Sequence, residues 1–348
     1  MDKVLDSPYF LPCYISTMVF LIGLMIGSFL NVVALRLLWD ESFVLPRSKC
    51  PKCKTEIKWY DNIPVLSYIF LKAKCRHCKE HISIQYPIVE LFTGIMFLFV
   101  YLSFGFTLQS LFLIVLVALL IVSTITDFKE QVIYDIVSYP IVPLGLLYNY
   151  FDIGNVGGSM LRIPLNGIGV TVNFQEAFVS AIIGTIIGAS IFTSLTFIFK
   201  RIIKEQEAFG LGDSILMAGL GAWFGWKLLI VILILSLLVQ FAVGLPCIVY
   251  NMYKDKDYKS LIYLGLLMFS AAIPPLGTAL NFTQNPFGAL FVTIIAFGVA
   301  VKSILVIFER MKERQRFTVL PLGPAIVLAG FVVMFFGQQI LSKYMSFM

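Results

Sequence analysis

Long apolar stretches separated by short polar breaks run through almost the whole chain. About 20 consecutive apolar residues form an α-helix that can cross roughly 30 Å of hydrocarbon. Such stretches predict helices at 14–38, 86–104, 108–126, 132–150, 177–200, 213–251, 260–280, 286–308 and 318–342. The stretch 213–251 is long enough for two helices, with a break near Gly225. The pattern predicts an all-α polytopic membrane protein with about nine to ten transmembrane helices.

The first apolar stretch differs from a removable signal peptide. It has no small-residue cleavage site before the polar segment, and polar Asn31 and Arg36 lie in its inner half. We therefore expect residues 1–38 to hold a retained transmembrane helix. Residues 39–84 are the one substantial polar segment, and residues 85–348 form the rest of the membrane part.

Composition agrees with a bilayer protein, since 59% of residues are hydrophobic and only 13% are charged. The net charge of +6 is explained by membrane orientation rather than by nucleic-acid binding, because no basic helix or aromatic-interleaved strand accompanies it. Lys and Arg gather in 36–79 and in the breaks of the same parity, near 129, 200–204, 254–259 and 310–316. Cytoplasmic loops carry such an excess. We expect the N-terminus to lie outside and residues 39–84 to lie on the cytoplasmic side of the membrane.

Four of the six cysteines form two CxxC pairs within the polar segment, Cys50 with Cys53 and Cys75 with Cys78. Four thiolates at this spacing can close a tetrahedron around Zn²⁺, and a segment too small for its own core gains stability from a metal. Two disulfides are the alternative. A reducing cytoplasm disfavours them, so we expect a structural zinc site.

Two aspartates stand at the ends of apolar stretches. Asp127 ends the third stretch and Asp213 opens the sixth, and counting crossings puts both at the inner face. Charged residues at such positions are costly and are functional candidates. If the two carboxylates approach each other and share a proton, one acts as base on a water while the other polarises a peptide carbonyl. Gly210 and Gly212 remove side chains beside Asp213 and let a backbone come close.

Each aspartate also has a structural interpretation as a helix cap, in which the helix dipole stabilises its charge without catalysis. Glu90 and Asp135 lie near the same face. They are either accessory to the aspartate pair or ion partners of the basic segment.

Several ordered motifs resemble the type IV prepilin peptidases, which are bifunctional leader peptidases and N-methyltransferases. The motifs are Gly27-Ser-Phe-Leu-Asn31, both CxxC pairs, Trp59-Tyr-Asp-Asn-Ile-Pro-Val-Leu-Ser67, Tyr86-Pro-Ile-Val-Glu90, Asp127, Phe209-Gly-Leu-Gly-Asp213, Leu220-Gly-Ala-Trp-Phe-Gly225 and Leu320-Pro-Leu-Gly-Pro324. They cover most of the chain.

The resemblance implies that Asp127 and Asp213 are the catalytic pair of a GxGD-type aspartyl protease. It would cut the basic leader of prepilin or pseudopilin precursors after a glycine on the cytoplasmic side. The new N-terminus would then be methylated from S-adenosylmethionine. The chain holds no Gly-x-Gly-x-x-Gly on a strand-to-helix turn, so residues for this cofactor would come from the inner loop and helix ends.

The chain departs from the family pattern at three places. After Asp127 such enzymes often continue to an Ile-Pro-Asp, whereas this chain has Ile133-Tyr134-Asp135. Ile215 stands where a lysine commonly follows the Gly-x-Gly-Asp motif. Residues 251–317 hold an extra helix pair. These departures bear on the methyl-transfer half more than on the peptidase.

Two functions of other classes also fit a membrane protein with inner-face carboxylates. One is a proton-coupled transporter, which predicts acidic residues spread through the bilayer depth. The other is a non-catalytic pilus or secretion assembly scaffold with a zinc-stapled loop. Replacing either aspartate by asparagine distinguishes them, because a scaffold tolerates the change and a catalytic pair does not.

Overall fold

The computed structural model describes residues 10–39, 42, 48–151, 153, 174–203, 210–279, 294–303, 305–306 and 321–345. Predictions for Phe209, Leu320 and most of 280–320 lie outside these residues. The described part is helical, and its only extended pairings are two isolated bridges, Lys49 with Glu56 and Lys74 with His81. The predicted all-α class is confirmed.

The helices follow one another closely along the chain. They are α2 Phe10–Leu38, η1 Trp59–Asn62, α3 Leu66–Phe70, α4 Gln85–Phe104, α5 Leu108–Glu130, α6 Asp135–Ser138, α7 Ile141–Tyr150, α9 Phe174–Ile203, α10 Leu211–Lys254, α11 Tyr258–Ala279 and α13 Gly323–Met345. Among the described residues, six of them (α2, α4, α5, α9, α10 and α13) are long and apolar enough to cross a membrane, and two shorter apolar helices follow at Tyr258–Ser270 and Ile294–Ser303. The chain is a multi-pass membrane protein.

Two of the predicted membrane stretches contain a break, one that was predicted and one that was not. Gly225 interrupts α10 with φ 74° and ψ 172°, as predicted. The part 211–224 before the break spans about 21 Å, and the part 226–254 after it spans about 44 Å, so only the second part is as long as the hydrocarbon is thick. The single helix predicted at 132–150 was wrong. It is divided into α6 and α7 around Pro140, whose ring nitrogen has no N–H to donate to the helical ladder.

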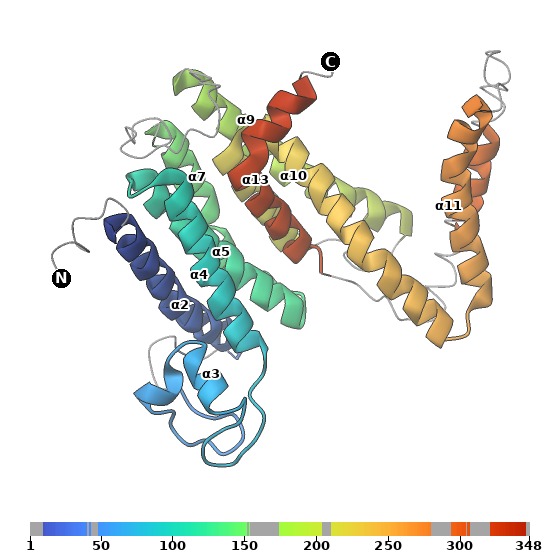
Figure 1. Cartoon of the computed structure of the whole chain (residues 1–348). Coiled ribbons are helices and arrows are strands. Elements are labelled where there is room, and N and C mark those ends of the chain that lie inside the picture. Colours follow the sequence, from blue (N-terminus) through green and yellow to red (C-terminus); the bar gives the residue numbers. More distant parts are fainter. Residues whose placement is uncertain are drawn as a thin grey trace. The chain divides into compact units, whose positions relative to one another are not determined.

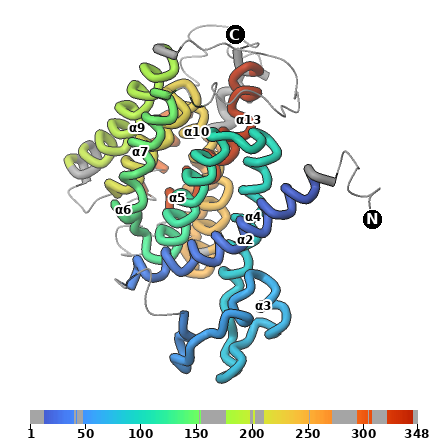
Figure 2. Tube along the Cα trace, turned by 90° about the vertical axis from the view of Figure 1, so that its left-hand side faces the viewer, coloured from blue at the N-terminus to red at the C-terminus, as the bar shows by residue number. Residues whose placement is uncertain are grey.

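The chain divides into two compact units, residues 1–237 with 321–348, and residues 238–320. In the first unit, α2 and α4 lie side by side, and the polar segment with α3 lies beyond their ends (Figure 1 and Figure 2). A Cβ on Gly23 would stand 2.7 Å from Gly94 Cα, so this pair of helices packs backbone against backbone.

The core of the first unit lies among α5, the first part of α10, and α13. Its fully buried side chains include Leu116, Leu120, Leu216, Met217, Leu220 and Ile326. Because α4 and α5 are joined by the three residues 105–107, α5 runs back toward the end where α4 begins (Figure 1). Packing of α5, α10 and α13 therefore brings the C-terminal end of α5 to the starts of the other two helices.

Small residues also join α10 to α7 and α9. A Cβ on Gly221 would collide with the Gly184 carbonyl, so α9 and α10 are in backbone contact. Trp223 Nε1 donates to the Ile141 carbonyl at 2.9 Å, and Asn149 Nδ2 donates to the Ala222 carbonyl at 2.8 Å. These contacts fix the part of α10 that carries Asp213.

Candidate active site and metal centre

Asp127 lies in the last turn of α5 and is 5% exposed. Gln131 ends the helix in the left-handed conformation, and its N–H donates to the Asp127 carbonyl at 2.9 Å. This cap holds the last turn closed around the carboxylate. A carboxylate at a helix C-terminus is disfavoured by the dipole of its own helix, so it needs donors from elsewhere.

Those donors come from the start of α13. The backbone N–H of Gly323, the first residue of that helix, donates to the Asp127 carboxylate. A Cβ at Gly323 would collide with Asp127 Oδ2, so only glycine allows this approach. Asp127 Oδ2 has no hydrogen-bond partner among the described residues. A buried carboxylate oxygen without a protein donor can accept a hydrogen bond from a water or a bound molecule.

Asp213 lies in the first turn of α10 and is half-buried. Its N–H donates to the Gly210 carbonyl at 3.2 Å, and the Gly210 amide interacts in turn with its carboxylate. The charge of Asp127 acts directly on Asp213, so the two carboxylates lie within electrostatic reach. The predicted pair is brought together by tertiary packing.

Ile133 holds the surrounding segments in contact. A Cβ on Gly212 would stand 2.7 Å from Ile133 Cβ, and one on Gly323 would stand 3.4 Å from Ile133 Cδ1. The segment after α5 is therefore wedged between the starts of α10 and α13. Ile133 fits there because Gly212 and Gly323 have no side chains, and this packing brings the helix ends that carry the two carboxylates together.

Three residues of this site had no predicted role. Gly323 and Ile133 belong to it by contact, and Ser214, 3% exposed beside Asp213, has a hydroxyl without a partner among the described residues. The Pro-Leu-Gly-Pro motif that ends at Pro324 was the one available signal for Gly323. Ile133 and Ser214 follow no pattern that a single sequence displays.

Glu90 and Asp135 lie in other surroundings. Glu90 is 6% exposed and its Oε2 accepts from the Val65 N–H at 2.7 Å, so it binds the polar segment. Asp135 is exposed at the start of α6. Within the described part of the chain, neither is a hydrogen-bond or charge partner of Asp127 or Asp213.

The four cysteines of the polar segment converge. Their Sγ atoms all lie within 4.8 Å of one another, and Cys50 Sγ is 3.8 Å from Cys78 Sγ. All four are free thiols, since a disulfide requires about 2.05 Å between sulfurs. The donor set fits a thiophilic metal ion such as Zn²⁺.

The two CxxC turns have the same backbone construction. Lys54 N–H donates to the Cys50 carbonyl at 2.9 Å, and Lys79 N–H donates to the Cys75 carbonyl at 3.1 Å. Lys54 and Lys79 both adopt positive φ, 57° and 60°, and each turn is closed by its isolated bridge. This repeated turn geometry presents two sulfurs from each side to one centre.

The thiols differ in acidity. Hydrogen bonds from the Thr55 hydroxyl and amide lower the pKa of Cys53 to about 6. The Glu80 amide lowers the pKa of Cys78, but burial and the neighbouring thiols outweigh it and raise that pKa to about 11. The lowered pKa favours the thiolate form of Cys53, which is the form that ligates a metal, whereas a metal held by Cys78 would displace its thiol proton to solvent.

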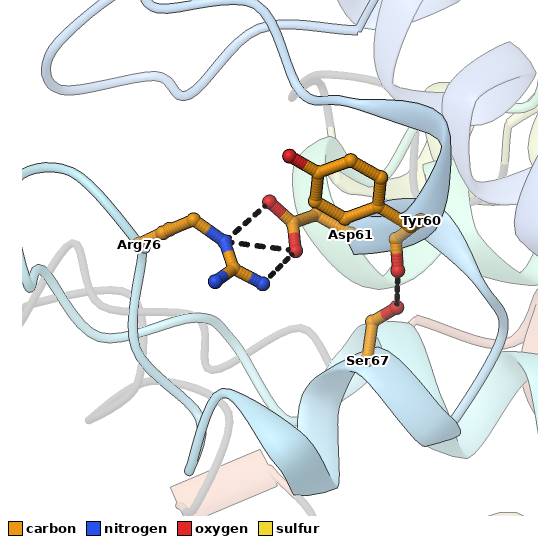
Figure 3. A network of polar contacts seen from close by, with 4 residues as sticks. All are labelled: Tyr60, Asp61, Ser67 and Arg76. Carbon is orange, nitrogen blue, oxygen red and sulfur yellow. Dashed lines mark hydrogen bonds and ion pairs between the residues drawn. The ribbon is translucent and has the colours of Figure 1, made fainter.

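A charged pair braces the second turn. Arg76 donates to both oxygens of Asp61, with Nε to Oδ2 at 2.8 Å, and this lowers the pKa of the Asp61 carboxyl (Figure 3). Ser67 Oγ donates to the Tyr60 carbonyl at 3.1 Å, which ties η1 to α3 (Figure 3). Polar contacts outside the cysteine cluster thus hold this segment together.

The fold and the site define the class of this protein. It is a multi-pass helical membrane protein with two carboxylates at converging helix ends and a four-cysteine centre. Residues 21–104 match the bacterial peptidase A24 N-terminal domain, and residues 114–245 match the type IV leader peptidase family. The chain belongs to this family.

Relatives named prepilin leader peptidase/N-methyltransferase are similar over much of the chain. The one from Myxococcus xanthus is 35% identical over 237 residues, covering 68% of this chain and 64% of the relative. That from Aeromonas salmonicida is 33% identical over 76% of this chain and 93% of its own length. That from Pseudomonas aeruginosa is 27% identical over 94% and 92%. No solved structure matches the chain.

Proposed function

We propose that this protein is a prepilin leader peptidase in which Asp127 and Asp213 are the catalytic pair. The observation that carries the proposal is that the two carboxylates lie within electrostatic reach of each other, with the Gly323 amide on Asp127 and one oxygen of Asp127 left without a partner in the described structure. Relatives with the leader peptidase name support the substrate class, which is the leader of type IV prepilin or pseudopilin precursors.

Such a pair can hydrolyse a peptide without a covalent intermediate. The ionised carboxylate takes a proton from a water as the water oxygen bonds to the scissile carbonyl carbon. The protonated carboxyl donates to the carbonyl oxygen. Collapse of the intermediate breaks the C–N bond, and the amine leaves with a proton from the pair. Gly210, where a Cβ would meet only Gly212 N and Asp213 Oδ2 at 3.8 Å and 3.9 Å, leaves room for an extended substrate beside Asp213.

The experiment uses purified protein in lipid nanodiscs, a pilin-like precursor and S-adenosylmethionine, with product masses as the readout. We expect loss of the leader and gain of one methyl group. Asp127→Asn and Asp213→Asn should each lower cleavage by about 10²–10⁴-fold. Glu130→Gln, on an exposed residue one turn beyond Asp127, is the matched control and should cleave normally. Full cleavage by either asparagine variant contradicts the catalytic role of that aspartate, and an intact precursor with the unaltered, folded protein contradicts the peptidase itself.

The methyl-transfer half rests on the relatives' names. S-adenosylmethionine supplies an electrophilic methyl group, and the free N-terminal amine left by cleavage is the acceptor. Loss of the leader without a methyl increment leaves a peptidase alone. That outcome fits the departures at Tyr134 and Ile215.

We propose that Cys50, Cys53, Cys75 and Cys78 hold one structural Zn²⁺ that stabilises the polar segment. Four closed thiolate ligands leave no open position for a substrate, which is typical of structural zinc. Elemental analysis should find about one zinc per chain and its loss in a Cys50→Ser, Cys78→Ser variant. Retention of zinc by that variant contradicts the site.

A further inference from the structure

The helix α3 carries an apolar face that the rest of the described structure leaves uncovered. Its residues Leu66, Ile69 and Phe70, spaced i, i+3 and i+4, are 50%, 61% and 80% exposed. Trp59 in the neighbouring η1 is also 80% exposed. Large apolar side chains gathered in a short polar segment mark an interaction surface rather than a core.

A hydrogen bond fixes how far this face lies from the membrane. Glu90, which accepts from the Val65 N–H, is five residues into α4, about 7.5 Å along its axis. The 20 residues of α4 span about 30 Å, the thickness of the hydrocarbon. The Glu90 side chain leans toward the start of α4, so Val65, the residue before α3, is held within about 7.5 Å of the edge of the hydrocarbon.

The rest of α3 lies close to that level, because the helix is short. Its five residues extend about 7.5 Å, and the headgroup layer adds roughly 5–8 Å on each side of the hydrocarbon. Val65 has φ 61° and ψ −49°, an unfavourable backbone for a β-branched residue, and the buried Glu90 carboxylate holds it there. The start of α3 is thus fixed by a strained and buried contact.

The charge of the segment selects one kind of partner. Residues 48–84 hold eight Lys and Arg against three Asp and Glu. Lys58, Lys72 and Lys74 are exposed next to η1 and α3. Apolar and aromatic side chains flanked by lysines are the composition of segments that insert at the surface of an anionic bilayer.

We propose that the face formed by Leu66, Ile69 and Phe70 inserts into the headgroup region of the bilayer that α2 and α4 cross. The segment with the cysteine centre is then anchored to the membrane at two points, the Glu90–Val65 hydrogen bond and α3. The anchor does not depend on peptidase activity.

The test places one tryptophan reporter in the full chain. Phe70→Trp is made in a Trp39→Phe, Trp59→Phe background, and the signal of the remaining Trp223 and Trp226 is subtracted. Lys52→Trp in the same background is the control, at a lysine of the first CxxC turn whose side chain is 68% exposed. Both proteins are reconstituted in phosphatidylglycerol nanodiscs that contain lipids brominated near the headgroups.

Brominated lipid should quench the reporter at 70 about threefold more strongly than that at 52, because only the former enters the interface. Leu66→Trp should give the same excess if Phe70→Trp fails to fold. Equal or weaker quenching at 66 and 70 than at 52 overturns the proposal. Shielding of position 70 that develops only after a prepilin precursor is added also overturns it, and assigns the face to the substrate.

Discussion

At the scale of single residues, the site depends on the absence of side chains at two glycines as well as on the two carboxylates. Asp127 receives the Gly323 amide only because Gly323 has no side chain, and Ile133 fits against Gly212 for the same reason. The free oxygen of Asp127 and the free hydroxyl of Ser214 are buried polar atoms without partners in the described chain. Unsatisfied groups of this kind are costly, and active sites are where they occur.

Gly323→Ala tests whether this close approach matters. The added methyl group must displace the Asp127 carboxylate or Ile133, so we expect cleavage to fall on the order of 100-fold, as for other sub-ångström misplacements. Gly265→Ala, where a Cβ would meet nothing within 4 Å, is the control and should cleave normally. An active Gly323→Ala enzyme with an unchanged rate contradicts the geometry.

At the scale of elements, polar pairs stabilise the short pieces and small residues stabilise the long ones. The Arg76–Asp61 pair lowers the pKa of Asp61, so its stabilisation is complete above the ordinary aspartate pKa of about 4. It is lost as the pH falls through the lower pKa of the folded state. The pair thus supports the second CxxC turn at neutral pH but not in acid.

Arg76→Gln should therefore speed amide hydrogen exchange in residues 59–62 and 75–78 a few-fold at pH 6. The difference from the unaltered protein should begin to shrink below about pH 4, the ordinary aspartate pKa, and should disappear once the pH falls below the lower pKa of Asp61 in the folded, Arg76-paired state. Arg76→Lys keeps the charge and loses the two-pronged geometry, so it should fall between them. A difference that stays constant from pH 6 to pH 3 argues against the pair.

The contact of α9 with α10 is the most sensitive of the helix contacts. Gly221→Ala places a methyl group against the backbone of Gly184, and we expect a loss of about 1–3 kcal/mol in the free energy of unfolding. Gly298→Ala meets nothing within 4 Å and serves as the control. Unfolding by sodium dodecyl sulfate in mixed micelles measures the stability of both variants. Equal unfolding midpoints would show that α9 and α10 can move apart to accept the methyl group without loss of stability.

At the scale of the whole molecule, the distribution of lysine and arginine predicts the orientation. Phe106, 93% exposed between α4 and α5, should lie outside, and Glu130 at the other end of α5 should lie inside. In a Cys13→Ser, Cys247→Ser background, an impermeant maleimide should label Phe106→Cys in cells with a permeabilised outer membrane. Glu130→Cys should react only after the inner membrane is broken. The reverse pattern would invert the topology.

The membrane helices and the cysteine centre can be predicted from the sequence, because each depends on a local pattern of residues. Apolar runs as long as a bilayer is thick determine that α2, α4, α5, α9, α10 and α13 are membrane helices, and Gly225 marks the break in α10. The CxxC spacing determines a four-thiol centre, because each pair closes within a single turn. Pro140 was visible too, but whether a proline bends or divides an apolar run depends on its neighbours.

Only the tertiary structure decided what meets at the ends of the helices. Three contacts join segments that are distant in the sequence. Gly323 donates to Asp127, and Ile133 separates Gly212 from Gly323. Glu90 binds Val65 instead of the aspartate pair. Hydropathy and residue spacing report how a segment relates to water and lipid, not which face of one helix packs against which face of another. Close packing of small residues sets those faces, and it placed the two carboxylates together.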